Sequence, residues 1–182
     1  MKNMFWILSA TACLSALYFA QQPSKRTVSP QAQARIEREV RHELLMIPQY
    51  GVFDNLAYQV NGYDVTLTGS VTQPIIKASA ERAVKSIEGV EKIDNKIVVL
   101  PVNTADNQIR LAVYRAIYGS SALERYALQS IPSIHLIVNT GTVTLEGAVA
   151  TKGDADMATI RAKTVGGVFS VTSNLKIDTP SK

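Results

Sequence analysis

VTLTGSV occupies residues 65–71, and VTLEGAV occupies residues 143–149. Five of the seven positions are identical in the two stretches. Alternating apolar and polar residues over this length are typical of a β-strand with one buried face. A strand that occurs twice in a chain of 182 residues indicates that a larger unit has been duplicated.

The two copies match without gaps downstream of these strands. Apolar, alanine and glycine positions coincide over the whole length of the copy. The matched pairs are Ala80 and Ala158, Val84 and Ala162, Gly89 and Gly167, Ile93 and Val171, Ile97 and Leu175, and Val99 and Ile177. Upstream, the first helices align only if the second copy has a short insertion, which falls between residues 119 and 129.

Each copy predicts the same order of elements. Apolar residues at helical spacing predict one helix before the two strands and one after them. The apolar positions are Ile36, Val40, Leu44 and Ile47, then Ile76, Ala80, Val84 and Ile87, then Ile109, Val113 and Ile117, then Ala155, Ala158, Ala162 and Val165. Asn61-Gly62 and Asn139-Thr140-Gly141 predict the turns of two hairpins, because Asn and Gly tolerate positive φ.

We therefore predict an α+β fold of two tandem αββαβ units. Each unit is expected to have a three-stranded mixed sheet with two helices on one face. The predicted domains are residues 32–101 and 105–178. Gly69 and Gly147 are expected to end the second strand of each copy, where a bend or a close approach of two backbones favours glycine.

The first residues have the composition of a targeting segment. Lys2 precedes an apolar run over residues 4–20, which predicts a signal peptide or an N-terminal anchor over residues 1–20. The sequence ATAC that ends at Cys13 distantly resembles a lipoprotein processing box, which is a third alternative. Residues 21–31 contain two prolines and predict a flexible spacer.

Composition argues against several classes of function. The net charge is +4, but the excess lies in the tails, so neither copy has the basic stripe of a nucleic-acid binder. Cys13 is the only cysteine, and the two histidines, His42 and His135, are far apart in the sequence. We expect a solvated His42, a structural His135, no metal site, no cofactor and no enzymatic activity. Asp154 and Asp156 are expected to complement a helix dipole.

These units resemble the BON domain. The resemblance rests on VTLTGSV and VTLEGAV, on GVEKIDNKIVV at residues 89–99, and on GGVFSVTSNLKI at residues 166–177. Ser173 stands where the first copy has Asn95, which is a minor departure. The resemblance implies a periplasmic or surface-associated protein that binds phospholipid membranes or maintains the envelope under stress. It implies no catalytic residues.

Two sets of residues are candidates for binding lipid or a partner. Met157, Ile160 and Thr164 add a second stripe to a predicted helix, where the first copy has Ser79, Arg82 and Ser86. The extra apolar area needs a partner, and the alternatives are the first copy, another protein chain and a lipid surface. Tyr114 and Tyr118 lie off the main stripe of their helix and are typical of an interface or a half-buried groove.

The sequence thus predicts an exported, non-catalytic protein with two tandem domains, which associates with phospholipid membrane or the cell envelope. The alternative is a structural adaptor that binds envelope proteins or itself, without affinity for lipid. The expected location is periplasmic or exported, with residues 4–20 as a membrane anchor if they are retained. The oligomeric state and the packing of one domain on the other stay open.

Overall fold

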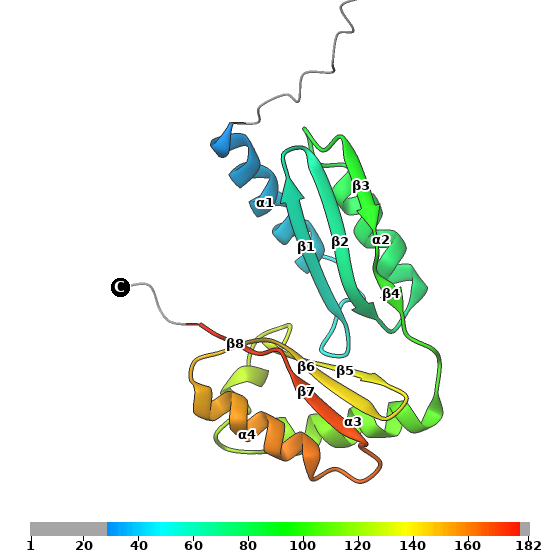
Figure 1. Ribbon diagram of the computed structural model, residues 1–182, viewed down its shortest axis with the longest axis vertical. Helices are drawn as coiled ribbons and strands as arrows, with labels where there is room; N and C mark the ends of the chain where they lie inside the picture. Colours follow the sequence, from blue (N-terminus) through cyan, green and yellow to red (C-terminus); the bar gives the residue numbers. More distant parts are fainter. Residues whose placement is uncertain (1–28, 179–182) are drawn as a thin grey trace, which may run out of the picture.

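The computed structural model describes residues 29–178, which form two units of the same architecture (Figure 1). The first unit runs from α1 to β4. Its elements are α1 (Pro30–Leu45), β1 (Asn55–Asn61), β2 (Asp64–Val71), α2 (Pro74–Lys85), β3 (Lys92–Asn95) and β4 (Val98–Val99).

The second unit repeats this order from α3 to β8, with one addition. Its elements are α3 (Thr104–Tyr118), the 3-10 helix η1 (Glu124–Ala127), β5 (Ile134–Asn139), β6 (Thr142–Val149), α4 (Lys152–Lys163), β7 (Ser170–Ser173) and β8 (Lys176–Ile177). The additional helix η1 lies within the predicted insertion, which is confirmed.

Both sheets have the predicted mixed topology. β1 pairs antiparallel with β2, and β2 pairs parallel with β3 and then with β4. β3 and β4 therefore form one broken edge strand, interrupted where the buried side chain of Ile97 enters the core. β5, β6, β7 and β8 repeat the arrangement. The prediction of two αββαβ units is confirmed.

Two separate cores hold the units together. In the first unit, Ile36 and Val40 of α1 and Ile76 and Val84 of α2 are fully buried against the sheet. In the second unit, α4 contributes only Ala158 and Ala162 as fully buried positions. Small residues on α4 leave its larger apolar side chains, Met157 and Ile160, outside the core.

α1 begins at a capping residue that lies within the predicted spacer. The Ser29 hydroxyl accepts a hydrogen bond from the Ala32 amide at 3.2 Å, and Pro30 occupies the first helical position. The predicted spacer over residues 21–31 therefore extends two residues too far. The predicted signal peptide or anchor over residues 1–20 lies outside the described residues. None of the helices within residues 29–178 has the length and hydropathy needed to cross a membrane.

Gly147 permits a close approach of two strands. Its φ is +112°, and a Cβ atom at this position would overlap the carbonyl oxygen of Ser133. Gly69 has the same relation to Asn55 in the first unit, so the repeated motif keeps its glycine for this reason.

We expect Gly147→Ala to lower the free energy of unfolding by about 2 kcal/mol, because the residue would be strained at positive φ and would collide with backbone. Gly166→Ala is the matched control, since a Cβ there meets no atom within 4 Å. Urea denaturation of both variants measures the difference. Equal stabilities would contradict this account of the motif.

Candidate functional site

The two units are joined through the loop between α1 and β1, residues 46–54. This loop reaches the edge strand β5 of the second unit, where the Leu136 amide donates a hydrogen bond to the Val52 carbonyl at 2.7 Å. Val52 and Phe53 also pack against the core of the second unit. The two units thus share a direct contact as well as a short linker (Figure 1).

Asp54 holds this loop in its conformation. Its carboxylate is 3 % exposed and accepts hydrogen bonds from the Thr72 amide at 2.6 Å and the Thr72 hydroxyl at 2.8 Å. The Gly51 amide donates to the same carboxylate at 3.2 Å. A buried carboxylate is tolerated here because its oxygens are satisfied by these donors.

His135 lies in the contact between the units. Its ring stacks on Tyr50 with centroids 5.4 Å apart, and its Nε2 is 3.4 Å from the Tyr50 hydroxyl. Burial lowers the pKa of His135 and raises the pKa of Tyr50 to about 12. The buried Nδ1 has no hydrogen-bond partner within residues 29–178. His135 therefore has the structural role that the sequence predicted.

The two candidate tyrosines, both on α3, lie next to the contact between the units. Tyr118 is buried, and its hydroxyl donates to the Ile134 carbonyl. Burial raises the pKa of Tyr118. Tyr114 packs between Tyr118, at a centroid distance of 4.9 Å, and Phe53 of the first unit, at 6.2 Å. The interface that their pattern indicated is thus intramolecular.

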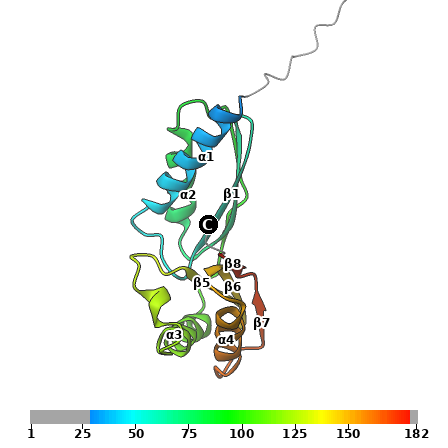
Figure 2. The ribbon, with the colours of Figure 1, turned by 90° about the vertical axis from the view of Figure 1, so that its left-hand side faces the viewer.

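The candidate residues of α4 lie elsewhere. Met157 is 36 % exposed and Ile160 is 57 % exposed, and Thr164 is exposed with its hydroxyl bonded to the Arg161 carbonyl. α4 and α3 cover the side of the second sheet that faces away from the first unit (Figures 1 and 2). The structure therefore does not bring the α4 stripe and the two tyrosines together in one site.

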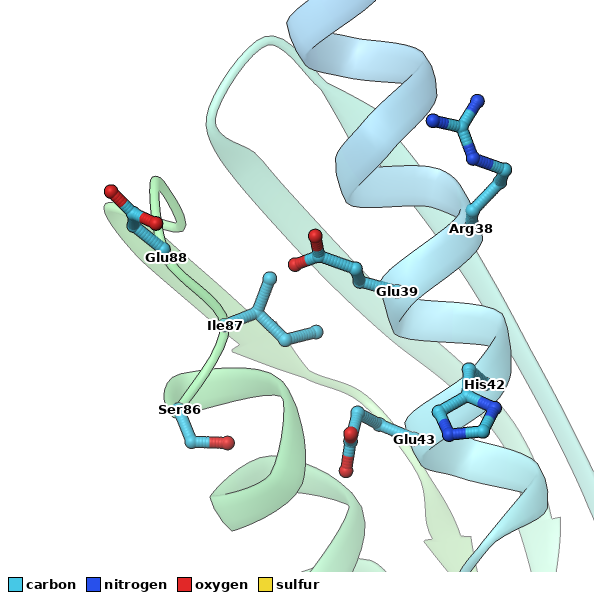
Figure 3. Close-up of a pocket in the computed structure, with 7 residues that line it drawn as sticks. All are labelled: Arg38, Glu39, His42, Glu43, Ser86, Ile87 and Glu88. Atoms are coloured by element: carbon cyan, nitrogen blue, oxygen red, sulfur yellow. The ribbon is translucent and has the colours of Figure 1, made fainter.

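Each unit has a hollow beside its first helix, and the two hollows overlap only in part when the copies are aligned. In the first unit the hollow has a volume of about 400 Å³ and is largely charged. Figure 3 shows its lining from α1 and from the end of α2, with Glu39 and Glu43 directed toward α2. The lining residues are Arg38, Glu39, His42, Glu43, Ser86, Ile87 and Glu88. His42 is exposed at its rim, as expected from the sequence.

The hollow of the second unit has a volume of about 460 Å³ and lies between the first half of α3, the turn between β5 and β6, and the loop after α4. Ala112 and Gly166 occupy the positions of Glu39 and Glu88, and Phe169 occupies the position of Glu91. The Phe169 ring lies against Gly141 and is nevertheless 85 % exposed. The second unit has therefore exchanged charge for apolar surface at this end.

Phe169 was not among the candidates from the sequence, whereas Leu111 lies off the main stripe of its helix together with Tyr114 and Tyr118. Leu111 is 49 % exposed on α3, one position before Ala112. The repeat alignment contains the signal, since Phe169 replaces Glu91 and Leu111 replaces Arg38. Only the fold, however, brings α3 and the loop after α4 to one surface. Leu111 on α3, Met157 and Ile160 on α4, and Phe169 in the loop after α4 are exposed, and they are referred to below as the apolar helical face.

Within the described residues, no group of three His, Cys, Asp or Glu side chains is placed to hold a metal ion. Asp154 caps α4 together with Thr151, and it pairs with Arg125 at 2.6 Å. Hydrogen bonds from Thr151 lower the pKa of Asp154, with contributions from Tyr126 and Arg125. This carboxylate thus lies in the first turn of α4, where an acidic residue complements the helix dipole.

The described residues form a tandem of two small αββαβ domains. The BON domain model matches residues 32–101 and 106–179, and the chain belongs to the BON domain family. This family comprises non-catalytic, lipid-associated and envelope-associated modules, which occur in periplasmic and envelope proteins.

Comparison with solved structures gives distant similarities. One is described as CdsD, a structural protein of the Type III secretion system of Chlamydia trachomatis, at 12 % identity and a TM-score of 0.29, covering 78 % of this chain and 91 % of that chain. The C-terminal domain of CdsD matches at 14 % identity and a TM-score of 0.27, covering 77 % and 96 %. No curated protein matches the chain.

The contact at His135 predicts a dependence of stability on pH. The lowered pKa means that the unfolded chain binds more protons, so stability is lost as the pH falls through and below the ordinary His pKa of about 6.5. Asp54 and Glu146 face the ring and oppose the shift, but burial is the larger effect.

Thermal unfolding of the wild type and of His135→Gln is measured from about pH 8 to about pH 5, a range that spans the ordinary His pKa. The wild type should lose stability relative to the variant as the pH falls. Melting temperatures that change in parallel would show that His135 does not titrate in the contact.

Proposed function

We propose that this protein is exported and binds the surface of phospholipid membranes through the apolar helical face of its second unit. The observation that carries the proposal is the exchange between the two copies. Positions that are charged in the first unit, Arg38 and Glu91, are Leu111 and Phe169 in the second, and both are exposed. Clustered exposed apolar side chains mark an interaction surface.

The charges around this face favour an anionic surface. Arg161 and Lys163 lie in the last turn of α4, and Arg115 lies in the last turn of α3. Asp154 is engaged with Arg125 and Thr151, so Asp156 is the carboxylate of α4 that opposes these cations most directly. Each basic side chain near an anionic membrane contributes about 1 kcal/mol.

Apolar contact supplies the second contribution. Transfer of a Phe or Ile side chain out of water is favourable by about 1.5–3 kcal/mol, provided that the side chain becomes fully buried. Phe169 and Ile160 are exposed by 85 % and 57 %, so both have apolar area to lose on binding. The two contributions together are of the size expected for reversible binding to a membrane surface.

A liposome sedimentation experiment tests the proposal. Residues 21–182 are mixed with neutral and with anionic phosphatidylglycerol-containing vesicles at low and high salt. We expect binding to anionic vesicles that weakens with salt, because the cationic contribution is screened. The double variant Phe169→Ser/Ile160→Ser should bind the vesicles at least roughly tenfold more weakly than the wild type, because two apolar contacts are removed.

Leu128→Ser is the matched control, since Leu128 is 80 % exposed and lies beyond the C-terminal end of α3. It should bind like the wild type. Circular dichroism establishes that all variants are folded. Equal binding by the double variant, or no binding to any vesicle, would refute the proposal and favour the adaptor alternative, in which envelope proteins are the partners.

A further inference from the structure

The edge strand of the second sheet is covered along its length. β5 turns the backbone groups of Ile134, Leu136 and Val138 away from β6. The Ile134 carbonyl accepts from the Tyr118 hydroxyl, and the Leu136 amide donates to Val52. The Val138 carbonyl accepts from the Arg110 guanidinium at 2.8 Å. Edge strands covered in this way do not pair with other chains.

The equivalent edge of the first sheet is open at its centre. Tyr58 pairs with Leu67 as Leu136 pairs with Leu145, so the backbone groups of Tyr58 point outward from β1. Gln33 bonds the Val60 carbonyl at one end, and Tyr50 meets the Leu56 backbone at the other. The outward amide and carbonyl of Tyr58 have no hydrogen-bond partner within residues 29–178.

A groove runs beside this open edge. It has a volume of about 450 Å³ and is bounded by β1 from Leu56 to Val60, by Glu37 and Arg41 of α1, and by Lys176 of the second unit. Figure 2 looks onto this edge, with β1 beside α1. The groove therefore offers unpaired backbone groups to an extended segment.

Charges of opposite sign lie on either side of Tyr58. Its hydroxyl accepts a hydrogen bond from Arg41 at 3.3 Å and donates to the Glu37 carbonyl at 3.2 Å. Glu37 and Arg41 are both exposed and lie one helical turn apart. A twofold axis through Tyr58, perpendicular to the sheet, would place each Glu37 opposite Arg41 of the other copy.

We propose that β1 pairs antiparallel with β1 of a second copy of this chain, about a twofold axis through Tyr58. The two Tyr58 residues then exchange their amide and carbonyl hydrogen bonds, and the two first units form one continuous sheet. The surface is self-complementary in hydrogen bonding and in charge, as an isologous interface requires. The interface is distinct from the apolar helical face and does not depend on the proposed function.

Charge reversal with two tagged chains tests the interface. Full-length chains with different affinity tags are co-expressed and solubilised in mild detergent, and recovery of one tag with the other is quantified. Arg41→Glu leaves four carboxylates at a homotypic interface, and Glu37→Arg leaves four guanidinium groups there. Each homotypic pair should show a loss of recovery of roughly fivefold or more relative to wild type.

Co-expression of Arg41→Glu with Glu37→Arg should restore recovery to the wild-type level, because each acid again faces a base on the other chain. A folding defect in one chain does not account for such restoration. Arg38→Glu is the control, since it makes the same charge change on α1 at a residue that does not line the groove beside β1. Three outcomes would each overturn the proposal: no recovery with wild type, no loss with the single variants, or no restoration in the mixed pair.

Discussion

The hydrogen bond from the Leu136 amide to the Val52 carbonyl, 2.7 Å long, joins the two units, and the arrangement of the surfaces depends on it. Asp54 fixes the conformation of the loop that carries Val52, because its buried carboxylate accepts hydrogen bonds from Thr72 and Gly51. The contact covers the free edge of β5 and partly buries His135 and Tyr114. It thereby leaves α3 and α4 on the far side of the molecule, where their exposed side chains are accessible.

Duplication allowed the two units to diverge while their cores stayed alike. Leu67 and Leu145 are both fully buried, and Gly69 and Gly147 have nearly the same positive φ. Surface positions have no such packing constraint. The first unit has charged residues at Arg38 and Glu91 and an open strand edge, whereas the second has Leu111 and Phe169 at these positions and a covered edge. The proposed membrane contact and the proposed self-association therefore fall on different units of one chain.

Sequence patterns predicted the fold well because they report local constraints. The periodicity of Ile36, Val40 and Leu44 predicted a helix. The repeated strand motif and the turn before it predicted a hairpin in each unit. The insertion before β5 was also located correctly, although its short helix was not. Small errors arose at the boundaries, as at Pro30, which continues the spacer in composition but begins a helix in the structure.

Sequence alone determined the two αββαβ units, the family, and the exposed α4 stripe at Met157 and Ile160, since each follows from spacing along one element. Tertiary structure decided which surfaces are free. Tyr114 and Tyr118 are residues of a type common at binding surfaces. Tyr114, however, packs against Phe53, and the Tyr118 hydroxyl donates to the Ile134 carbonyl. Leu111 comes to the side of the α4 residues only through the packing of α3 beside α4. Such contacts depend on long-range geometry, which spacing along one element does not encode.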